Sequence, residues 1–118
     1  MLSAILATDD PYAAAKVFVS AGWTLDFETP ADSGDPLAAV SLGDAQLMLG
    51  TAEERFLASP EHRGDGVMFH LAVDDIDTVY VRHRDAGLAI EEPAVRPWGE
   101  TAFRAVIVGY RFMLTARS

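Results

Sequence analysis

Leu6-Ala7-Thr8-Asp9-Asp10 recurs as Leu71-Ala72-Val73-Asp74-Asp75, 65 residues further along the chain. A stretch that repeats at a fixed offset is the signature of a duplicated structural unit. Two dipeptides recur at the same offset: Ala21-Gly22 as Ala86-Gly87, and Met48-Leu49 as Met113-Leu114. Together these matches give eight identities in one ungapped register. The chain therefore divides into two copies, at residues 1–53 and 66–118, joined by a linker at 54–65 that contains Pro60 and Gly64.

Both copies begin with the same predicted strand and helix. A short apolar run, at residues 4–7 and again at 67–73, is typical of a buried strand. The paired aspartates that follow can cap a helix and interact with the positive end of its dipole. Helical spacing then predicts one buried face in each copy, made by Pro11, Ala14, Ala15 and Phe18 in the first and by Ile76, Val79, Tyr80 and His83 in the second. Gly22 and Gly87 lie where a helix ends in a left-handed residue.

Three further strands are predicted after each helix. They fall at residues 23–28, 37–42 and 45–49 in the first copy, and near 88–90, 101–108 and 110–116 in the second. Each copy is thus a βαβββ module. The predicted fold class is α+β, a single domain over residues 1–118 built of two tandem βαβββ modules.

Composition excludes several classes of protein. Half of the 118 residues are apolar and 23% are charged, unlike a disordered chain. No apolar run is long enough to span a membrane, and the first residues lack the basic start of a signal peptide. The formal charge of −9 disfavours nucleic acid and anionic lipid as partners, and suits solubility or a cationic ligand. Because the chain has no cysteine, disulfides and thiolate sites are excluded, and we expect a cytoplasmic protein.

Local motifs add a family resemblance to this architecture. The segments at residues 69–77 and 85–87, Pro97-Trp98-Gly99 and Phe103-Arg104 are similar to those of the vicinal oxygen chelate superfamily, which contains glyoxalase I, extradiol dioxygenases and bleomycin resistance proteins. The Pro-Trp-Gly segment most resembles the bleomycin-resistance branch. The resemblance implies that the two modules form a curled, cup-shaped mixed sheet whose halves enclose a site, and that a homodimer shares its cups between chains. One departure is Val108-Gly109, where relatives have a longer Asp-Pro-Asp-Gly-Asn-like turn, so we expect either a tighter turn or shifted ends of the strands that flank it.

The resemblance also implies where a metal would bind. Enzymes of the superfamily use one residue from the first and last strand of each module, and these positions fall on Ile5, Met48, His70 and Met113. A thioether is a poor ligand for the divalent ions concerned and isoleucine is none. We therefore expect no metal and no other cofactor. Two roles remain open for His70: contact with a ligand, or a hydrogen bond within the sheet.

Strand alternation predicts which side chains line the cup instead. The expected ligand-binding residues on the strands are His70, Met48, Met113, Met68, Gln46 and Arg111, and the family resemblance adds Trp98. Methionine adapts to irregular shapes and contacts aromatic rings favourably, so this lining suits an aromatic ligand. Trp98 could stack on that ligand or pack at the dimer interface, whereas Trp23, next to Gly22, is expected to be structural.

Three functional hypotheses follow. The first is a metal-free small-molecule binding protein that sequesters an antibiotic or another aromatic, cationic compound, as bleomycin resistance proteins do. The alternative is a metal-dependent enzyme of the glyoxalase or dioxygenase kind, which the apolar ligand positions disfavour. The second alternative is a non-catalytic structural or regulatory dimer. No catalytic residue is predicted.

Overall fold

The computed structural model describes residues 2–51 and 59–117, and both predicted modules are present in it. Module 1 contains β1 (Ala4–Thr8), α1 (Pro11–Ser20), β2 (Thr24–Glu28), β3 (Leu37–Leu42) and β4 (Ala45–Thr51). Module 2 contains β5 (Met68–Val73), α2 (Ile76–Asp85), β6 (Ala94–Val95), β7 (Thr101–Ile107) and β8 (Tyr110–Ala116). A short 3-10 helix, η2 (Pro60–His62), lies in the second part of the expected linker. Residues 54–58 of that linker lie outside the described residues.

Both helices begin as the paired aspartates predict. The Asp10 carboxylate accepts hydrogen bonds from the backbone N–H groups of Tyr12 and Ala13, and Pro11 occupies the first turn of α1. The Asp75 carboxylate accepts from the backbone N–H of Thr78 at the start of α2. After the helices, Gly22 (φ +98°) and Gly87 (φ +78°) adopt the left-handed conformation that glycine tolerates.

The strands form two four-stranded sheets with identical topology. Sheet 1 has the order β1-β4-β3-β2 and sheet 2 the order β5-β8-β7-β6. In each sheet the first strand pairs in parallel with the last strand of its module. The registers also match at the offset of 65, since Ala4 lies opposite Leu47 and Phe69 lies opposite Phe112. This confirms the α+β fold class with tandem βαβββ modules.

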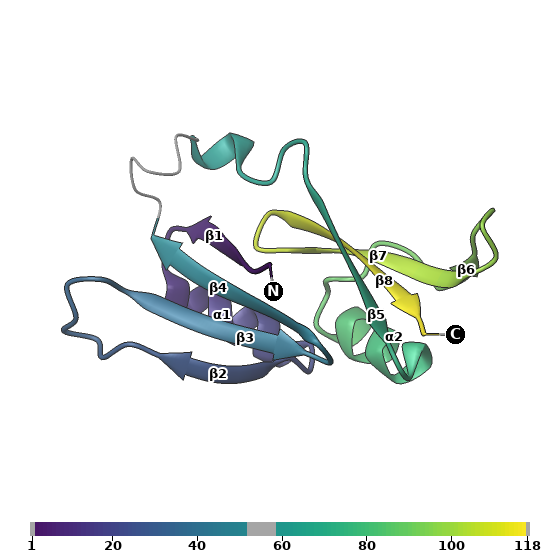
Figure 1. The fold of residues 1–118 in the computed structure, drawn as a ribbon, viewed down its shortest axis with the longest axis horizontal. Helices are drawn as coiled ribbons and strands as arrows, with labels where there is room; N and C mark the ends of the chain where they lie inside the picture. The colour runs from purple at the N-terminus through teal and green to yellow at the C-terminus, as the bar shows by residue number, and fades with distance from the viewer. Residues whose placement is uncertain (1, 52–58, 118) are drawn as a thin grey trace.

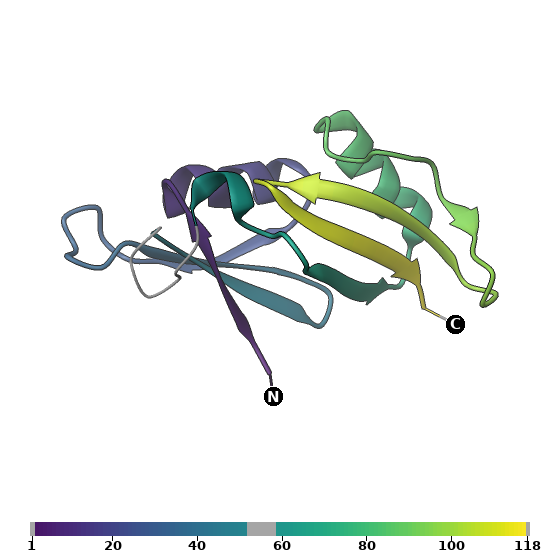
Figure 2. The ribbon, with the colours of Figure 1, turned by 90° about the horizontal axis from the view of Figure 1, so that it is seen from above.

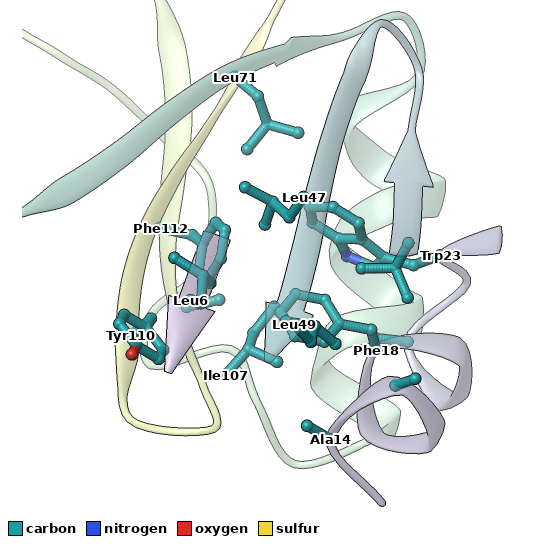
Figure 3. Close-up of a cluster of buried hydrophobic side chains, with 14 of the residues drawn as sticks. Leu6, Ala14, Phe18, Trp23, Leu47, Leu49, Leu71, Ile107, Tyr110 and Phe112 are labelled. Carbon is teal, nitrogen blue, oxygen red and sulfur yellow. The ribbon is translucent and has the colours of Figure 1, made fainter. Parts of the chain in front are cut away.

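One core runs through the junction of the two modules (Figure 3). Figures 1 and 2 show the modules side by side, with α1 and α2 on the same side of the molecule and the two sheets on the other. Phe18 of α1 packs edge-on against Trp23 and Phe112, with ring centroids 4.9 and 5.9 Å away. Because this core uses the helix-covered faces of both sheets, the opposite sheet faces remain open in the single chain.

Polar contacts also tie the modules together. Trp23 Nε1 donates to Nε2 of the buried His83 at 3.1 Å. The hydroxyl of Tyr110 donates to the backbone carbonyl of Ala7 at 2.7 Å. Arg117 pairs with Asp44 of module 1 as well as with Asp74 of module 2. Trp23 therefore has the structural position expected for it, and it binds a histidine from the other module.

Several strand boundaries differ from the sequence predictions. The strand expected near residues 88–90 is reduced to one isolated bridge between Ala89 and Ala105, and the strand that pairs with β7 is β6, beyond Pro93. The run expected to be buried at 67–73 begins as a strand at Met68, and both Val67 and Met68 are exposed. The reason is that β5 is an edge strand with one open face.

The turn between β7 and β8 is tight, and it lacks the longer segment that relatives have there. Val108 and Gly109 alone connect β7 to β8, with φ angles of +45° and +88°. Two consecutive positive φ angles are typical of a type I′ hairpin turn. A positive φ is strained for a β-branched residue such as Val108.

The helices of the described residues are too short or too polar to span a membrane.

Candidate functional site

The open face of sheet 1 carries apolar side chains around Met48. Met48 lies between Ile5 on β1 and Ala39 on β3 in the strand ladder, and Ala39 is opposite Phe27 on β2. Ile5 is 45% exposed and Phe27 is 44% exposed. Ile5 and Phe27 lie on the two edge strands of sheet 1, with Met48 and the buried Ala39 between them, so this face exposes apolar side chains at both edges.

A carboxylate lies on the same open face. Asp26 is at an irregularity in the pairing of β2 with β3, and it accepts hydrogen bonds from Ser41 Oγ and from Gln46 Nε2, both at 2.9 Å. Both donors are neutral, so the negative charge of Asp26 is not compensated by them. Gln46, predicted to contact a ligand, is therefore oriented by Asp26.

The open face of sheet 2 is built in the same way around Met113. Met113 lies between His70 on β5 and Arg104 on β7, and Met68, which is 45% exposed, lies opposite Arg111. Nε2 of His70 is 2.7 Å from Oγ1 of Thr115, the hydrogen bond within the sheet that was one of its two expected roles. That bond leaves Nδ1 of His70 as the remaining polar atom of its ring.

Arg111 points towards the linker side of this face. Its guanidinium donates to the backbone carbonyl of Gly64 at 3.1 Å, and Asp65 lies 4.0 Å away. Arg111 therefore already forms polar contacts within its own chain. Arg104, which lies beside Met113 on the same face, was not among the predicted site residues.

Glu91 is the carboxylate of the second open face. It accepts from Nε, Nη2 and the backbone N–H of Arg104 at 2.9–3.1 Å, and it forms a close ion pair with Arg96. These contacts, above all the hydrogen bonds from Arg104, lower the pKa of Glu91 from its ordinary 4.5 to about 2. Two guanidinium groups and one carboxylate leave this cluster with a net positive charge.

Asp26 and Glu91 are equivalent positions, because they are 65 residues apart. The two modules thus place a carboxylate at the same point of the same face, held by neutral donors in module 1 and by two arginines in module 2. Glu91 was not among the predicted site residues, because two adjacent acids such as Glu91-Glu92 are typical of a charged surface. The matching offset of 65 was the signal that could have found it.

Trp98 lies in the turn between β6 and β7 and is 55% exposed. The turn is closed by hydrogen bonds from Arg96 N–H to the Glu100 carbonyl and from Gly99 N–H to the Arg96 carbonyl, both 2.8 Å. Because Arg96 also pairs with Glu91, the cluster fixes the base of the segment that carries Trp98.

The predicted site residues therefore fall into two sets. Met48 and Gln46 belong to sheet 1, Met68, His70, Met113 and Arg111 belong to sheet 2, and Trp98 lies between β6 and β7 of sheet 2. The registers place Ile5 beside Met48 and His70 beside Met113, so each sheet contributes half of the predicted cup.

The four family metal positions do not fit a divalent ion. Their side chains offer one imidazole, two thioethers and one alkyl group, and the imidazole is already hydrogen-bonded to Thr115. Over residues 2–51 and 59–117, no group of three His, Asp or Glu side chains could hold a metal. The two faces offer adaptable apolar surface with a few fixed charges, which is suited to binding.

Comparisons with protein families and with curated proteins find no match. Solved structures, in contrast, match along nearly the whole chain. TioX from Micromonospora sp. ML1 is 22% identical, and the match covers 100% of this chain and 96% of TioX with a TM-score of 0.76. A bleomycin-binding protein in complex with bleomycin is 17% identical over 100% of this chain and 98% of its own, with a TM-score of 0.72.

A third structure carries the superfamily name itself. It is a member of the glyoxalase/bleomycin resistance protein/dioxygenase superfamily from Sphaerobacter thermophilus DSM 20745, 22% identical over 98% of this chain and 94% of its own, with a TM-score of 0.70. The chain therefore has the fold of this superfamily, whose bleomycin-resistance branch its sequence resembles.

Proposed function

We propose that the protein is a metal-free binding protein that works as a homodimer and sequesters a planar aromatic, cationic compound such as an antibiotic. The observation that carries the proposal is the pair of equivalent open faces with opposite charge. Both faces expose apolar side chains around a methionine, but Asp26 makes one face negative while the Glu91 cluster makes the other positive. The proposal includes the cytoplasmic location expected from the sequence.

A second copy of the chain suits these faces. Sheet 1 of one protomer can cover sheet 2 of its partner, because exposed apolar surface is then removed from water and the unlike charges attract. A cleft between the two faces would be lined by Met48 and Met113, with His70 at its floor and Trp98 beside it. Methionine and indole together supply adaptable and flat contacts for an aromatic ring.

Two further facts support a cationic aromatic ligand. The formal charge of −9 attracts cations, and Asp26 places one negative charge on the open face itself. One structural neighbour of the chain is a bleomycin-binding protein in complex with bleomycin, so a protein of this fold can hold an antibiotic. The likeness is one of fold, so the ligand has to be found by experiment.

Trp98→Ala tests the proposal. Calorimetric titration with bleomycin and other aromatic antibiotics identifies a ligand, and sedimentation measures the dimer. Stacking on an aromatic side chain contributes about 1–3 kcal/mol, so the variant should bind roughly ten- to a hundredfold more weakly while remaining a folded dimer. Trp98→Phe, which keeps a flat ring, should retain most of the affinity.

Three results would contradict the proposal. A concentration-independent monomer would exclude the shared cleft. A melting temperature that falls in Trp98→Ala, with unchanged affinity per folded dimer, would show that Trp98 packs only at the interface. About one tightly bound metal ion per chain, lost in His70→Ala, would favour a metal-dependent enzyme.

A further inference from the structure

A pocket of about 330 Å³ lies at the junction of the two modules, apart from Met48, Met113 and Trp98 of the proposed cleft. Its walls are apolar side chains of both modules: Trp23 and Leu47 from module 1, and Phe69, Leu71 and Phe112 from module 2. Leu47, Leu71 and Phe112 point towards a common space in Figure 3. Ala4 and Ala45 also line it, and Gln46 and His70 lie at its rim.

The pocket exists because module 1 is smaller than module 2 at two equivalent positions. Ala4 pairs with Leu47 as Phe69 pairs with Phe112, and Ala45 pairs with Leu42 as Tyr110 pairs with Ile107. Module 2 thus has the aromatic side chains of Phe69 and Tyr110 at the two positions where module 1 has Ala4 and Ala45. The missing volume corresponds to two aromatic rings.

Tyr110 shows how the filled counterpart is arranged. Its ring lies 6.4 Å from that of Phe69, and its hydroxyl, buried with the rest of the side chain, donates to the carbonyl of Ala7 at 2.7 Å. At the junction pocket the equivalent acceptor is the backbone carbonyl of Ala72, because Ala72 lies 65 residues after Ala7. Ala72 and Ala45 line a smaller hollow of about 240 Å³ that shares Asp44, His70 and Leu71 with the junction pocket.

The carbonyl of Ala72 can accept one more hydrogen bond. Its described side-chain donor is a guanidinium nitrogen of Arg117, at a long 3.4 Å. A carbonyl oxygen has two lone pairs, so a hydroxyl group can bind beside that contact. The junction pocket opens to solvent and is lined by polar as well as apolar side chains, among them Asp44 and His70. Its apolar walls still lack contact atoms on the pocket side, and an aromatic ring can supply them.

We propose that the junction pocket is a second binding site, specific for a small phenolic compound. The ring of the ligand occupies the place that Tyr110 fills in module 2, against Phe69 and Phe112. Its hydroxyl donates to the carbonyl of Ala72, as the Tyr110 hydroxyl donates to that of Ala7. This site is formed within one chain and does not depend on the proposed cleft.

The test uses 4-methylphenol, which is the tyrosine side chain as a free molecule, and toluene as the ring without the hydroxyl. In Trp98→Phe the sole remaining tryptophan is Trp23, at the pocket wall, so its fluorescence reports on this site alone. We expect a saturable fluorescence change with 4-methylphenol. Toluene should bind roughly fivefold more weakly, because one hydrogen bond is missing.

Ala45→Tyr restores the side chain of the other module and should occupy the pocket. We expect the affinity for 4-methylphenol to fall at least roughly tenfold and the melting temperature to rise. Ala31→Tyr, at an exposed position, is the matched control and should change neither. If Ala45→Tyr fails to fold, Ala45→Met fills part of the same space and should weaken binding less.

Two outcomes would overturn the inference. One is unsaturable or absent binding in the Trp98→Phe protein. The other is unchanged affinity in folded Ala45→Tyr or Ala45→Met. Neither outcome bears on antibiotic binding in the shared cleft, which the Trp98→Ala titration measures separately.

Discussion

The two modules share one backbone plan and differ in how its interior is filled. Helix starts, strand order and register coincide at the offset of 65. At the junction, however, Phe69, Tyr110 and Phe112 in module 2 correspond to two alanines and Leu47 in module 1. The strand framework therefore tolerates large changes of side-chain volume, and module 2 supplies most of the aromatic packing at the junction.

The open faces differ in charge rather than in shape. Each has a methionine at its centre and a carboxylate at the same position, but Asp26 is bound by a hydroxyl and an amide whereas Glu91 is bound by two guanidinium groups. A duplicated module whose two copies were identical would repel itself across a shared cleft. Because the donors around the equivalent carboxylates Asp26 and Glu91 differ, the two open faces carry complementary charges.

The largest expected effect is the loss of an aromatic core side chain in module 2. Phe112 is buried and packs against Phe18, Trp23 and Phe69, so Phe112→Ala should lower the free energy of unfolding by about 3–5 kcal/mol. Its counterpart Leu47→Ala should cost only about 2–3 kcal/mol, because Leu47 already borders the junction pocket. Denaturant unfolding at one fixed protein concentration measures the free energy of unfolding of both variants. An equal or larger cost for Leu47→Ala would mean that the two junction ends are packed alike.

A smaller, pH-dependent effect should come from His83, whose equivalent in module 1 is Phe18. An indole N–H only donates, so the bond from Trp23 requires an unprotonated Nε2 on His83. Burial lowers the pKa of His83 in the folded protein. The stability that depends on neutral His83 is therefore fully present above the unfolded pKa of about 6.5, and is lost as the pH falls below it, by up to about 1.4 kcal/mol per pH unit.

His83→Gln removes this titration and keeps an acceptor for Trp23. Its free energy of unfolding should be nearly flat between about pH 7 and pH 5.5, apart from the contribution of other groups. His62→Gln, at an exposed histidine, is the matched control and should leave the decline in place. A decline that persists undiminished in His83→Gln would show that another group is responsible.

Sequence reasoning could predict what depends on local chemistry and period. The capping aspartates and the alternation on β5 and β8 involve neighbours within a few residues, and the repeat at offset 65 can be found by comparing the sequence with itself. The structure contains all three. A tight turn at Val108-Gly109 was one of two alternatives that the sequence allowed, and the positive φ of Val108 was not predicted.

What could not be predicted involves partners that only the fold brings together. Trp23 was expected to be structural, but its acceptor His83 is 60 residues away and on the other module. Glu91 has its arginines five and 13 residues further on, across a loop whose path depends on β6. The junction pocket, likewise, is a deficit of volume between two sheets, which no single stretch of sequence records.

The smallest expected effect compares the two equivalent carboxylates. Glu91 loses charge-assisted hydrogen bonds from Arg104 and Arg96 when it becomes glutamine, so Glu91→Gln should cost about 1–2 kcal/mol. Asp26→Asn loses only bonds to neutral donors and should cost less than about 0.5 kcal/mol. Denaturant unfolding of both variants at neutral pH measures the difference, and equal costs would contradict it.

The pH profile sharpens this comparison. The folded pKa of Glu91 is about 2 against an ordinary 4.5, so its contribution is present above about pH 4.5 and disappears as the pH falls towards 2. Wild-type protein and Asp26→Asn should therefore lose stability together over this range. Glu91→Gln should begin lower and decline less, so that its curve approaches that of the wild type near pH 2. Parallel curves for wild type and Glu91→Gln would show that the arginines do not bind this carboxylate more tightly when folded. The charge difference between the two open faces would then lack its structural basis.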